Sequence, residues 1–134
     1  MWSGPRNLST ALMYAFAARG DTAVTDEPFY AAWLAATGAR HPMRQAVLAS
    51  QPTDAQAVAA ALSGPCDRPV WYQKHMVHHL LPGFPQRWMD GCRHALLIRH
   101  PARVVASYLA RHEIPAFDDL GFAQQAELFD RLGA

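Results

Sequence analysis

Hydrophobic residues recur along the chain in two patterns, short continuous runs and longer stretches with helical spacing. The first long stretch, residues 11–18, follows Ser9 and Thr10, whose hydroxyls can cap the free amides of a helix. Arg19-Gly20 then supplies a cation and a glycine, which are typical of a helix end. Because Gly4-Pro5 forms a turn ahead of these residues, the pattern predicts a loop followed by a helix.

The next run places an acidic pair at the end of a strand. Residues 22–25 are predicted to form a short buried strand, which Asp26-Glu27-Pro28 ends. A second helix is predicted over residues 29–36, ending at Gly38. Glu27 therefore falls at the carboxyl end of a predicted strand.

The rest of the chain continues this alternation. Residues 39–52 have no readable pattern, but Thr53-Asp54-Ala55-Gln56 has the form of a capping box ahead of an alanine-rich helix that Gly64-Pro65 ends. The remaining predicted elements are strands over residues 69–74 and 95–98, a loop or short helix over residues 75–82, and helices from Pro101 and over residues 121–132.

Alternating strands and helices predict an α/β fold, a three-layer sandwich with a mainly parallel sheet. Residues 95–98 are apolar throughout, which is typical of a strand buried on both faces. In such sheets, ligands bind beyond the carboxyl ends of the strands. Glu27, His75 and Arg99 all follow predicted strands, so we expect them at this edge.

Composition limits the classes of function. With 134 residues, 51% hydrophobic and 17% charged, the chain is predicted to form a single domain over residues 1–134. A net charge of +1 excludes non-specific collection of nucleic acid or an anionic membrane. Cys66 and Cys92 form neither a CxxC motif nor a disulfide framework, and no run is long enough to span a bilayer. We expect a protein of the reducing cytoplasm.

The first segment, residues 3–10, has the chemistry of an anion site. A loop before a helix presents free N–H groups to an anion, Arg6 adds a planar charged donor, and the Ser9 and Thr10 hydroxyls can donate. A Walker A loop would need Gly and Lys at positions 9 and 10, so ATP hydrolysis is disfavoured. The alternative is that Ser9 is an ordinary cap and Arg6 a solvated charge.

The second segment, residues 99–107, joins a strand end to a helix. Arg99 directly follows the predicted strand, and Ser107 lies two turns along the next helix, so one anion could contact both. Considered alone, Arg99 could equally form a structural ion pair, and Ser107 could bond back to a helix carbonyl.

Together, the two segments resemble the sulfotransferase superfamily, which uses 3′-phosphoadenosine 5′-phosphosulfate as donor and has a P-loop-like fold. Pro5-Arg6-Asn7-Leu8-Ser9-Thr10 is similar to its P-[KR]-S-G-[TS]-T loop, with Asn-Leu in place of Ser-Gly. Arg99, Pro101 and Ser107 match its more specific R-x-P-x-x-x-x-x-S signature. The likeness runs from residue 2 to about residue 111. It implies that the second segment holds the 3′-phosphate, and that the 5′-phosphosulfate is held by Arg6, Asn7, Leu8, Ser9 and Thr10.

Sulfuryl transfer needs a base and a cation. Glu27-Pro28 resembles the E-P element of carbohydrate sulfotransferases, whose Glu is the proposed base. Lys74-His75 with the Leu80-Leu81-Pro82 that follows is similar to the K-T-H-(x)4-L-L-P stretch of cytosolic sulfotransferases, whose His is the base, although only the His matches in register. We rank Glu27 above His75 as the base, and Arg6 above Lys74 as the cation. The alternatives are a surface His and a Glu that merely begins a helix.

Three further expectations complete the interpretation. His75, His78 and His79 could ligate a metal ion, but no H-E-x-x-H motif or nearby Cys supports a metal site. The resemblance implies metal-free transfer to a hydroxyl or amine of a small molecule or carbohydrate.

Two alternative functions remain, a P-loop small-molecule kinase or nucleotide hydrolase, and a non-catalytic nucleotide-binding fragment. Little sequence precedes the first segment and no equivalent of the family's Arg/Lys-Gly loop follows the second. We therefore expect an incomplete domain whose open sheet edge can pair with a second copy.

Overall fold

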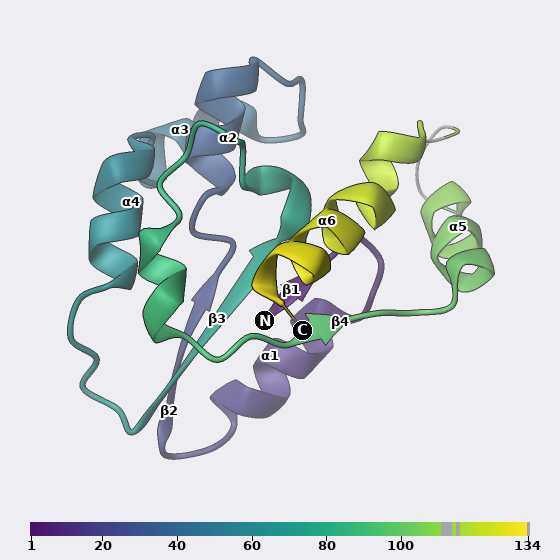
Figure 1. Cartoon of the computed structure of the whole chain (residues 1–134). Coiled ribbons are helices and arrows are strands. Elements are labelled where there is room, and N and C mark those ends of the chain that lie inside the picture. The colour runs from purple at the N-terminus through teal and green to yellow at the C-terminus, as the bar shows by residue number, and fades with distance from the viewer. Residues whose placement is uncertain (111–113, 115, 134) are drawn as a thin grey trace.

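The computed structural model describes residues 1–110, 114 and 116–133, which form a four-stranded parallel sheet flanked by helices (Figure 1). The strand order is β2-β3-β1-β4, and every neighbouring pair is parallel. The strands are β1 (Trp2–Ser3), β2 (Thr22–Asp26), β3 (Val70–Met76) and β4 (Leu96–Leu97). The predicted α/β class with a parallel sheet is confirmed.

Strand β3 lies between β2 and β1 and presents different side chains to the two faces of the sheet. Tyr72 stacks on Phe16 of the first helix, with ring centroids 4.2 Å apart, so Tyr72 and Lys74 share that face by the two-residue period. Gln73 and His75 point to the opposite face, where the Gln73 amide donates to the Leu62 carbonyl. Adjacent residues of one strand thus enter different environments.

Helices cover both faces of the sheet (Figure 1). Helix α1 (Ser9–Ala17) lies on the Tyr72 face, while α4 (Ala55–Leu62) and α6 (Phe122–Leu132) lie on the other. A hydrophobic core on that second face joins Trp2, Phe29, Trp88 and Leu128. The other helices are α2 (Tyr30–Thr37), α3 (Arg44–Ser50) and α5 (Pro101–Leu109), with short 3-10 turns η1 (Val77–His79), η2 (Arg87–Gly91) and η3 (Phe117–Leu120).

Several predicted boundaries were wrong. Ser9 is the first residue of α1 and neither Ser9 nor Thr10 caps it, because the N-cap is Leu8, which makes no side-chain cap bond. The capping box predicted at residues 53–56 does not form. Instead, the Asp54 carboxylate alone caps the helix, accepting a hydrogen bond from the Gln56 backbone amide at 2.9 Å.

Two strands also differ from their predictions. Strand β3 continues through His75 and Met76, which were expected in a loop, because these residues pair with Trp2 and Ser3. Strand β4 is a two-residue edge strand rather than one buried on both faces, and Ile98 beyond it is 78% exposed. The apolar run at residues 95–98 therefore partly faces outward, which places Arg99 close to the surface.

The segment around η3 and α6 crosses the first loop at close range. A Cβ on Gly4 would lie 2.5 Å from the Leu120 carbonyl oxygen, and one on Gly121, whose φ is +71°, would lie 3.3 Å from the Gly4 Cα. Only glycine fits such an approach of two backbones. Among the described residues, no helix has the length and apolar character needed to cross a bilayer.

Candidate functional site

The first segment forms a loop with unusual backbone angles. Arg6 and Leu8 have φ of +62° and +63°, in the left-handed region that non-glycine residues rarely adopt. Because Leu8 does not cap α1 and the first backbone bond of the helix runs from Leu12 N to Leu8 O, the preceding amides have no partner within the helix. An uncapped helix start of this kind is suited to an anion.

The second segment contacts this loop directly. The Arg99 guanidinium donates from Nη1 to the Arg6 carbonyl oxygen at 3.0 Å, and Arg6 donates from Nε to Ser107 Oγ at 3.0 Å. The bonded residues are far apart in the sequence: Arg6 and Arg99 are 93 positions apart, and Arg6 and Ser107 are 101 positions apart. The fold thus brings together the residues that the two motifs single out.

Asn7 anchors the loop to the sheet edge. Asn7 Nδ2 donates to the Leu97 carbonyl at 3.4 Å, and Gln125 Nε2 of α6 donates to the same oxygen at 2.9 Å. Asn7 is 3% exposed, and its Oδ1 is buried with no hydrogen-bond partner among the described residues. The remaining loop side chains differ in exposure, since Ser9 is buried whereas Leu8 and Thr10 are exposed.

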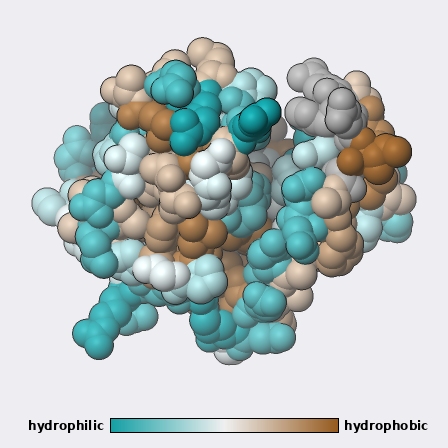
Figure 2. All heavy atoms as spheres, turned by 90° about the horizontal axis from the view of Figure 1, so that it is seen from above, coloured by the Kyte–Doolittle hydropathy of each residue, from teal (hydrophilic) through white to brown (hydrophobic). Residues whose placement is uncertain are grey.

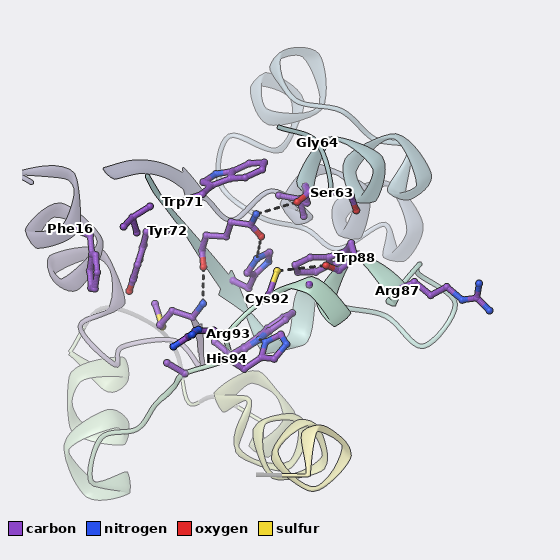
Figure 3. A pocket seen from close by; sticks show the side chains of 18 of the residues that line it. Phe16, Ser63, Gly64, Trp71, Tyr72, Arg87, Trp88, Cys92, Arg93 and His94 are labelled. Atoms are coloured by element: carbon purple, nitrogen blue, oxygen red, sulfur yellow. Dashed lines mark hydrogen bonds between the residues drawn. The ribbon is translucent and has the colours of Figure 1, made fainter. Parts of the chain in front are cut away.

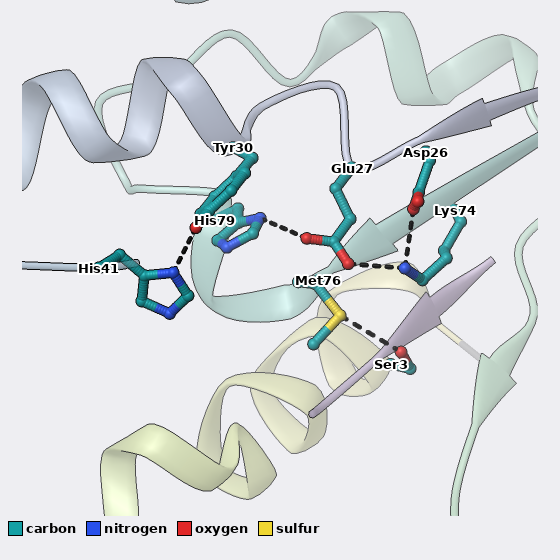
Figure 4. Close-up of polar contacts among 8 residues, drawn as sticks. All are labelled: Ser3, Asp26, Glu27, Tyr30, His41, Lys74, Met76 and His79. Carbon is teal, nitrogen blue, oxygen red and sulfur yellow. Dashed lines mark hydrogen bonds and ion pairs between the residues drawn. The ribbon is translucent and has the colours of Figure 1, made fainter. Parts of the chain in front are cut away.

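Glu27 lies at the carboxyl end of β2, where Lys74 holds it in place (Figure 4). Its backbone amide donates to the Lys74 carbonyl at 2.9 Å, and its Oε1 accepts from Lys74 Nζ at 2.6 Å. Lys74 Nζ also donates to Asp26 Oδ1 at 2.7 Å. Glu27, like Arg6 and Leu8, has a positive φ, +46°. Three of the four described non-glycine residues with positive φ therefore belong to the candidate site, as is common at functional sites.

Lys74 is the single lysine of the sequence, and its side chain is 2% exposed. Burial lowers the pKa of Lys74, but the hydrogen bonds that its ammonium donates to Asp26 and Glu27 outweigh that effect and raise the pKa above its usual value. Lys74 is therefore a fixed cation between two carboxylates. Its contacts are with Asp26 and Glu27, and the ranking of Arg6 above Lys74 as the cation of sulfuryl transfer stays a prediction.

His79 lies across the Glu27 carboxylate from Lys74 (Figure 4). Its Nδ1 is 3.9 Å from Glu27 Oε2, and its ring stacks on Tyr30 with centroids 4.9 Å apart. The Tyr30 hydroxyl is hydrogen-bonded to His41 Nδ1. Burial, followed by the neighbouring histidines, lowers the pKa of His79 to about 2, so this imidazole is neutral near pH 7.

Among the described residues, His75 makes no hydrogen bond or ion pair with Glu27, although both residues line one small cavity together with His79. His75 is 3% exposed, its ring stacks on Trp2 with centroids 4.5 Å apart, and it lies 4.8 Å from the Trp88 ring. Burial lowers the pKa of His75 to about 3. His75 also lines a hollow of about 990 Å³ beside the amino-terminal half of β3, together with Trp71 and Trp88 (Figure 3). This hollow does not include the first segment, the second segment or Glu27.

Viewed from above, the surface is hollowed between the main body and the part of the molecule on the right, with hydrophobic atoms lying deep in the hollow (Figure 2).

Among residues 1–110, 114 and 116–133, no three His, Cys, Asp or Glu side chains are grouped so that they could hold a metal ion. The candidate site therefore consists of charged, amide and hydroxyl groups around the carboxyl edge of the sheet.

Comparison with known proteins relates the chain to a family. A family model described as a sulfotransferase domain matches residues 1–134. The chain belongs to this sulfotransferase family. Residue 111, the last residue of the motif-based likeness, lies outside the described residues, but the family match extends beyond it. No solved structure matches the chain.

Two curated relatives come from Arabidopsis thaliana. Branched-chain-amino-acid aminotransferase-like protein 1 is 38% identical over 132 residues, which is 98% of this chain and 24% of the relative. Branched-chain-amino-acid aminotransferase-like protein 2 is 36% identical over 132 residues, covering 98% of this chain and 23% of the relative. The chain thus spans about a quarter of the length of the curated relatives that it matches.

Some site contacts were missed from the sequence. His79 was considered only as a metal ligand, and Gln125 was not considered at all, because no motif contains either residue. The signal for Lys74 was available, since the only lysine follows four strand residues and so falls near a carboxyl end. No sequence signal indicated that it would pair with Glu27.

Proposed function

We propose that this sulfotransferase domain takes a sulfuryl group from 3′-phosphoadenosine 5′-phosphosulfate and transfers it to a hydroxyl or amine of a small molecule or carbohydrate. The observation that carries the proposal is the contact between the two segments, in which Arg99 and Ser107 both bond to Arg6. An anion with two separated phosphate groups would find donors in both segments. The 3′-phosphate is assigned to Arg99 and Ser107, and the 5′-phosphosulfate to residues 6–10.

In this mechanism Glu27 is the base. Its Oε1 is bound to Lys74, so Oε2 is the oxygen open to an acceptor hydroxyl. As Oε2 takes the hydroxyl proton, the acceptor oxygen bonds to sulfur and the bond from sulfur to the phosphate bridging oxygen breaks. The bonding pair leaves with adenosine 3′,5′-bisphosphate. Arg6 stabilises the negative charge that develops on this leaving group.

Nucleotide binding by wild type, Arg99→Ala and Arg103→Ala tests the donor assignment. Arg103 is a matched control, since it is an exposed arginine of the same segment. We expect Arg99→Ala to bind adenosine 3′,5′-bisphosphate about 10 to 100-fold more weakly, because a charge-assisted bond is lost, while Arg103→Ala binds within about twofold of wild type. Adenosine 5′-monophosphate, which lacks the 3′-phosphate, should bind Arg99→Ala and wild type similarly.

Calorimetry with Mg-ATP separates this proposal from a P-loop kinase or nucleotide hydrolase. Metal-independent binding of the bisphosphate supports the sulfotransferase mechanism, whereas binding of Mg-ATP alone would overturn it. Bisphosphate binding without transfer to any acceptor, measured by release of the bisphosphate product, would favour a non-catalytic nucleotide-binding domain.

A further inference from the structure

The two oxygens of Glu27 have different surroundings. Oε1 accepts a hydrogen bond from Lys74 Nζ at 2.6 Å, whereas Oε2 lies 3.9 Å from His79 Nδ1, beyond hydrogen-bond distance. A carboxylate held at one oxygen can still rotate about its side-chain torsions. A base must present one lone pair in a fixed direction, so a second contact at Oε2 would orient it.

His79 is held firmly enough to make such a contact. Its ring is 4% exposed, it stacks on Tyr30 at an interplanar angle of 19°, and it lies 5.0 Å from the Trp33 ring. Tyr30 is fixed in turn, because its amide donates to the Glu27 carbonyl at 2.9 Å and its hydroxyl is bonded to His41. The helix that starts after Glu27 therefore aligns the imidazole with the carboxylate.

The Nδ1 atom of His79 is buried and has no hydrogen-bond partner among the described residues. Buried polar atoms are rarely left without a partner, and the exceptions often belong to working sites. Because burial lowers the pKa of His79 to about 2, the ring does not act as a cation toward Glu27. A neutral imidazole carries one N–H, and the Glu27 carboxylate offers an acceptor 3.9 Å from Nδ1.

We propose that His79 is a positioning residue for the base, in which Nδ1–H donates to Glu27 Oε2 while Lys74 holds Oε1. This assignment rests on the proposed function of Glu27. Closing the gap from 3.9 Å to a hydrogen bond of about 2.9 Å requires a movement of about 1 Å by the Glu27 side chain, which is 27% exposed. Oε2 then keeps a second lone pair for the acceptor proton.

Three variants separate this role from packing. His79→Phe keeps a ring against Tyr30 and Trp33 but removes the nitrogen, and His79→Asn returns a donor near the position of Nδ1. His78→Phe is the matched control, because His78 is half-buried, also has a buried Nδ1 without a hydrogen-bond partner, and has its ring centroid 4.4 Å from that of His79, yet it makes no contact with Glu27 among the described residues. The titratable groups that surround His79 are Glu27, Tyr30, His41, Lys74, His75 and His78.

The first measurement is sulfotransfer as a function of pH. We expect His79→Phe to lower kcat about tenfold with the donor KM within about twofold, and to move the acidic limb of the kcat profile upward by about one pH unit, because a bond to the charged form of the base is lost. His79→Asn should recover at least half of the shift. His78→Phe should leave the limb in place, and a limb that moves equally in both Phe variants would overturn the proposal.

The second measurement needs no turnover. Titration of the Glu27 carboxyl carbon by NMR, in protein labelled with 13C at glutamate, should give a midpoint at higher pH in His79→Phe than in wild type and His78→Phe. An unchanged midpoint would overturn the role of His79 even if sulfotransfer were observed. A shifted midpoint in a protein that transfers no sulfuryl group would instead refute the proposed function and retain the contact. If His79→Phe does not fold, His79→Asn and His79→Leu are compared instead. A wild-type midpoint in His79→Asn together with a raised midpoint in His79→Leu supports the positioning role of His79, and equal midpoints in these two variants contradict it.

Discussion

The candidate site has two halves that are assembled differently. The loop half, residues 3–10 and 99–107, is held mainly by side chains that donate to backbone carbonyls, since Arg99 bonds to the Arg6 carbonyl and Asn7 to the Leu97 carbonyl, while Arg6 bonds to the Ser107 hydroxyl. The acid half, made of Asp26, Glu27, Lys74 and His79, is held through side chains, with two short ion pairs to one buried ammonium.

The difference also concerns solvent. In the loop half, Leu8 and Thr10 are exposed while the neutral Asn7 and Ser9 are buried. In the acid half, the Asp26 side chain is 49% exposed, but the charged Lys74 is 2% and His79 is 4% exposed. An electrostatic contact is stronger where water is excluded, and an unpaired group costs more there. We therefore expect the largest effects from changes in the acid half, and smaller, binding-specific effects from changes in the loop half.

Replacing the proposed base is the strongest test of this comparison. Glu27→Gln keeps the size of the side chain but removes its basicity, and we expect turnover to fall about 10² to 10⁴-fold. Affinity for adenosine 3′,5′-bisphosphate should stay within about threefold, because the loop half is untouched. Steady-state sulfotransfer and calorimetry measure the two quantities. Asp26→Asn is the matched control at the same ammonium, and an equal loss of turnover in this variant would mean that Lys74, not Glu27, is the group that matters.

Stability should depend on pH through the histidines near the acid half. Burial lowers the pKa of His78 to about 4, so the folded state excludes a proton that the unfolded state, with a pKa near 6.5, takes up. Stability is therefore lost as the pH falls from 6.5 toward 4, by about 1.4 kcal/mol per pH unit for this group. The free energy of unfolding, measured with denaturant, should fall between pH 6.5 and pH 5 in both proteins. We expect this fall to be about 2 kcal/mol smaller in His78→Phe than in wild type. Equal losses in the two proteins would contradict the buried neutral state of His78.

The sequence was sufficient to identify the loop half because its chemistry is local. A Gly-Pro turn, an arginine and two hydroxyls within residues 4–10, and an arginine and serine eight residues apart, are visible without knowledge of the fold. The parallel sheet brought the two segments together as expected. Their direct contact was not predictable, since the sequence does not indicate the left-handed backbone of Arg6, the residue whose side chain bonds to Ser107.

The acid half could be predicted only in part, for a physical reason. Glu27 was located because a strand end is visible in the sequence, but its partners come from β3 and η1, which no motif links to it. His75 was considered as a base from its resemblance to the K-T-H stretch, and β3 was predicted to end at residue 74, two residues too early. When the strand continues through Met76, its two-residue period turns His75 toward the Trp88 core and Lys74 toward Glu27.

The loop half depends on close backbone packing by α6, which glycine substitutions can measure. A Cβ on Gly121 would lie 2.9 Å from Val77 Cγ2, and its φ of +71° already disfavours any other residue. Gly133→Ala is the matched control, since its φ is +66° but no described atom lies within 4 Å of such a Cβ. We expect Gly121→Ala to lower the free energy of unfolding by about 2 kcal/mol and Gly133→Ala by about 1 kcal/mol. Equal losses in denaturant unfolding would show that the contact with Val77 is relieved without cost.

The smallest effect should come from Ser107, at the point where the loop half joins α5. Ser107→Ala removes one neutral hydroxyl, so we expect adenosine 3′,5′-bisphosphate to bind about three to tenfold more weakly, less than the loss in Arg99→Ala. Because Ser107 Oγ also accepts from Arg6 Nε, its removal frees Arg6, and the double variant Arg6→Ala/Ser107→Ala shows whether the two act together. Losses that add would mean that each residue contacts the nucleotide independently, whereas a double variant no weaker than Arg6→Ala would mean that Ser107 acts only by orienting the arginine.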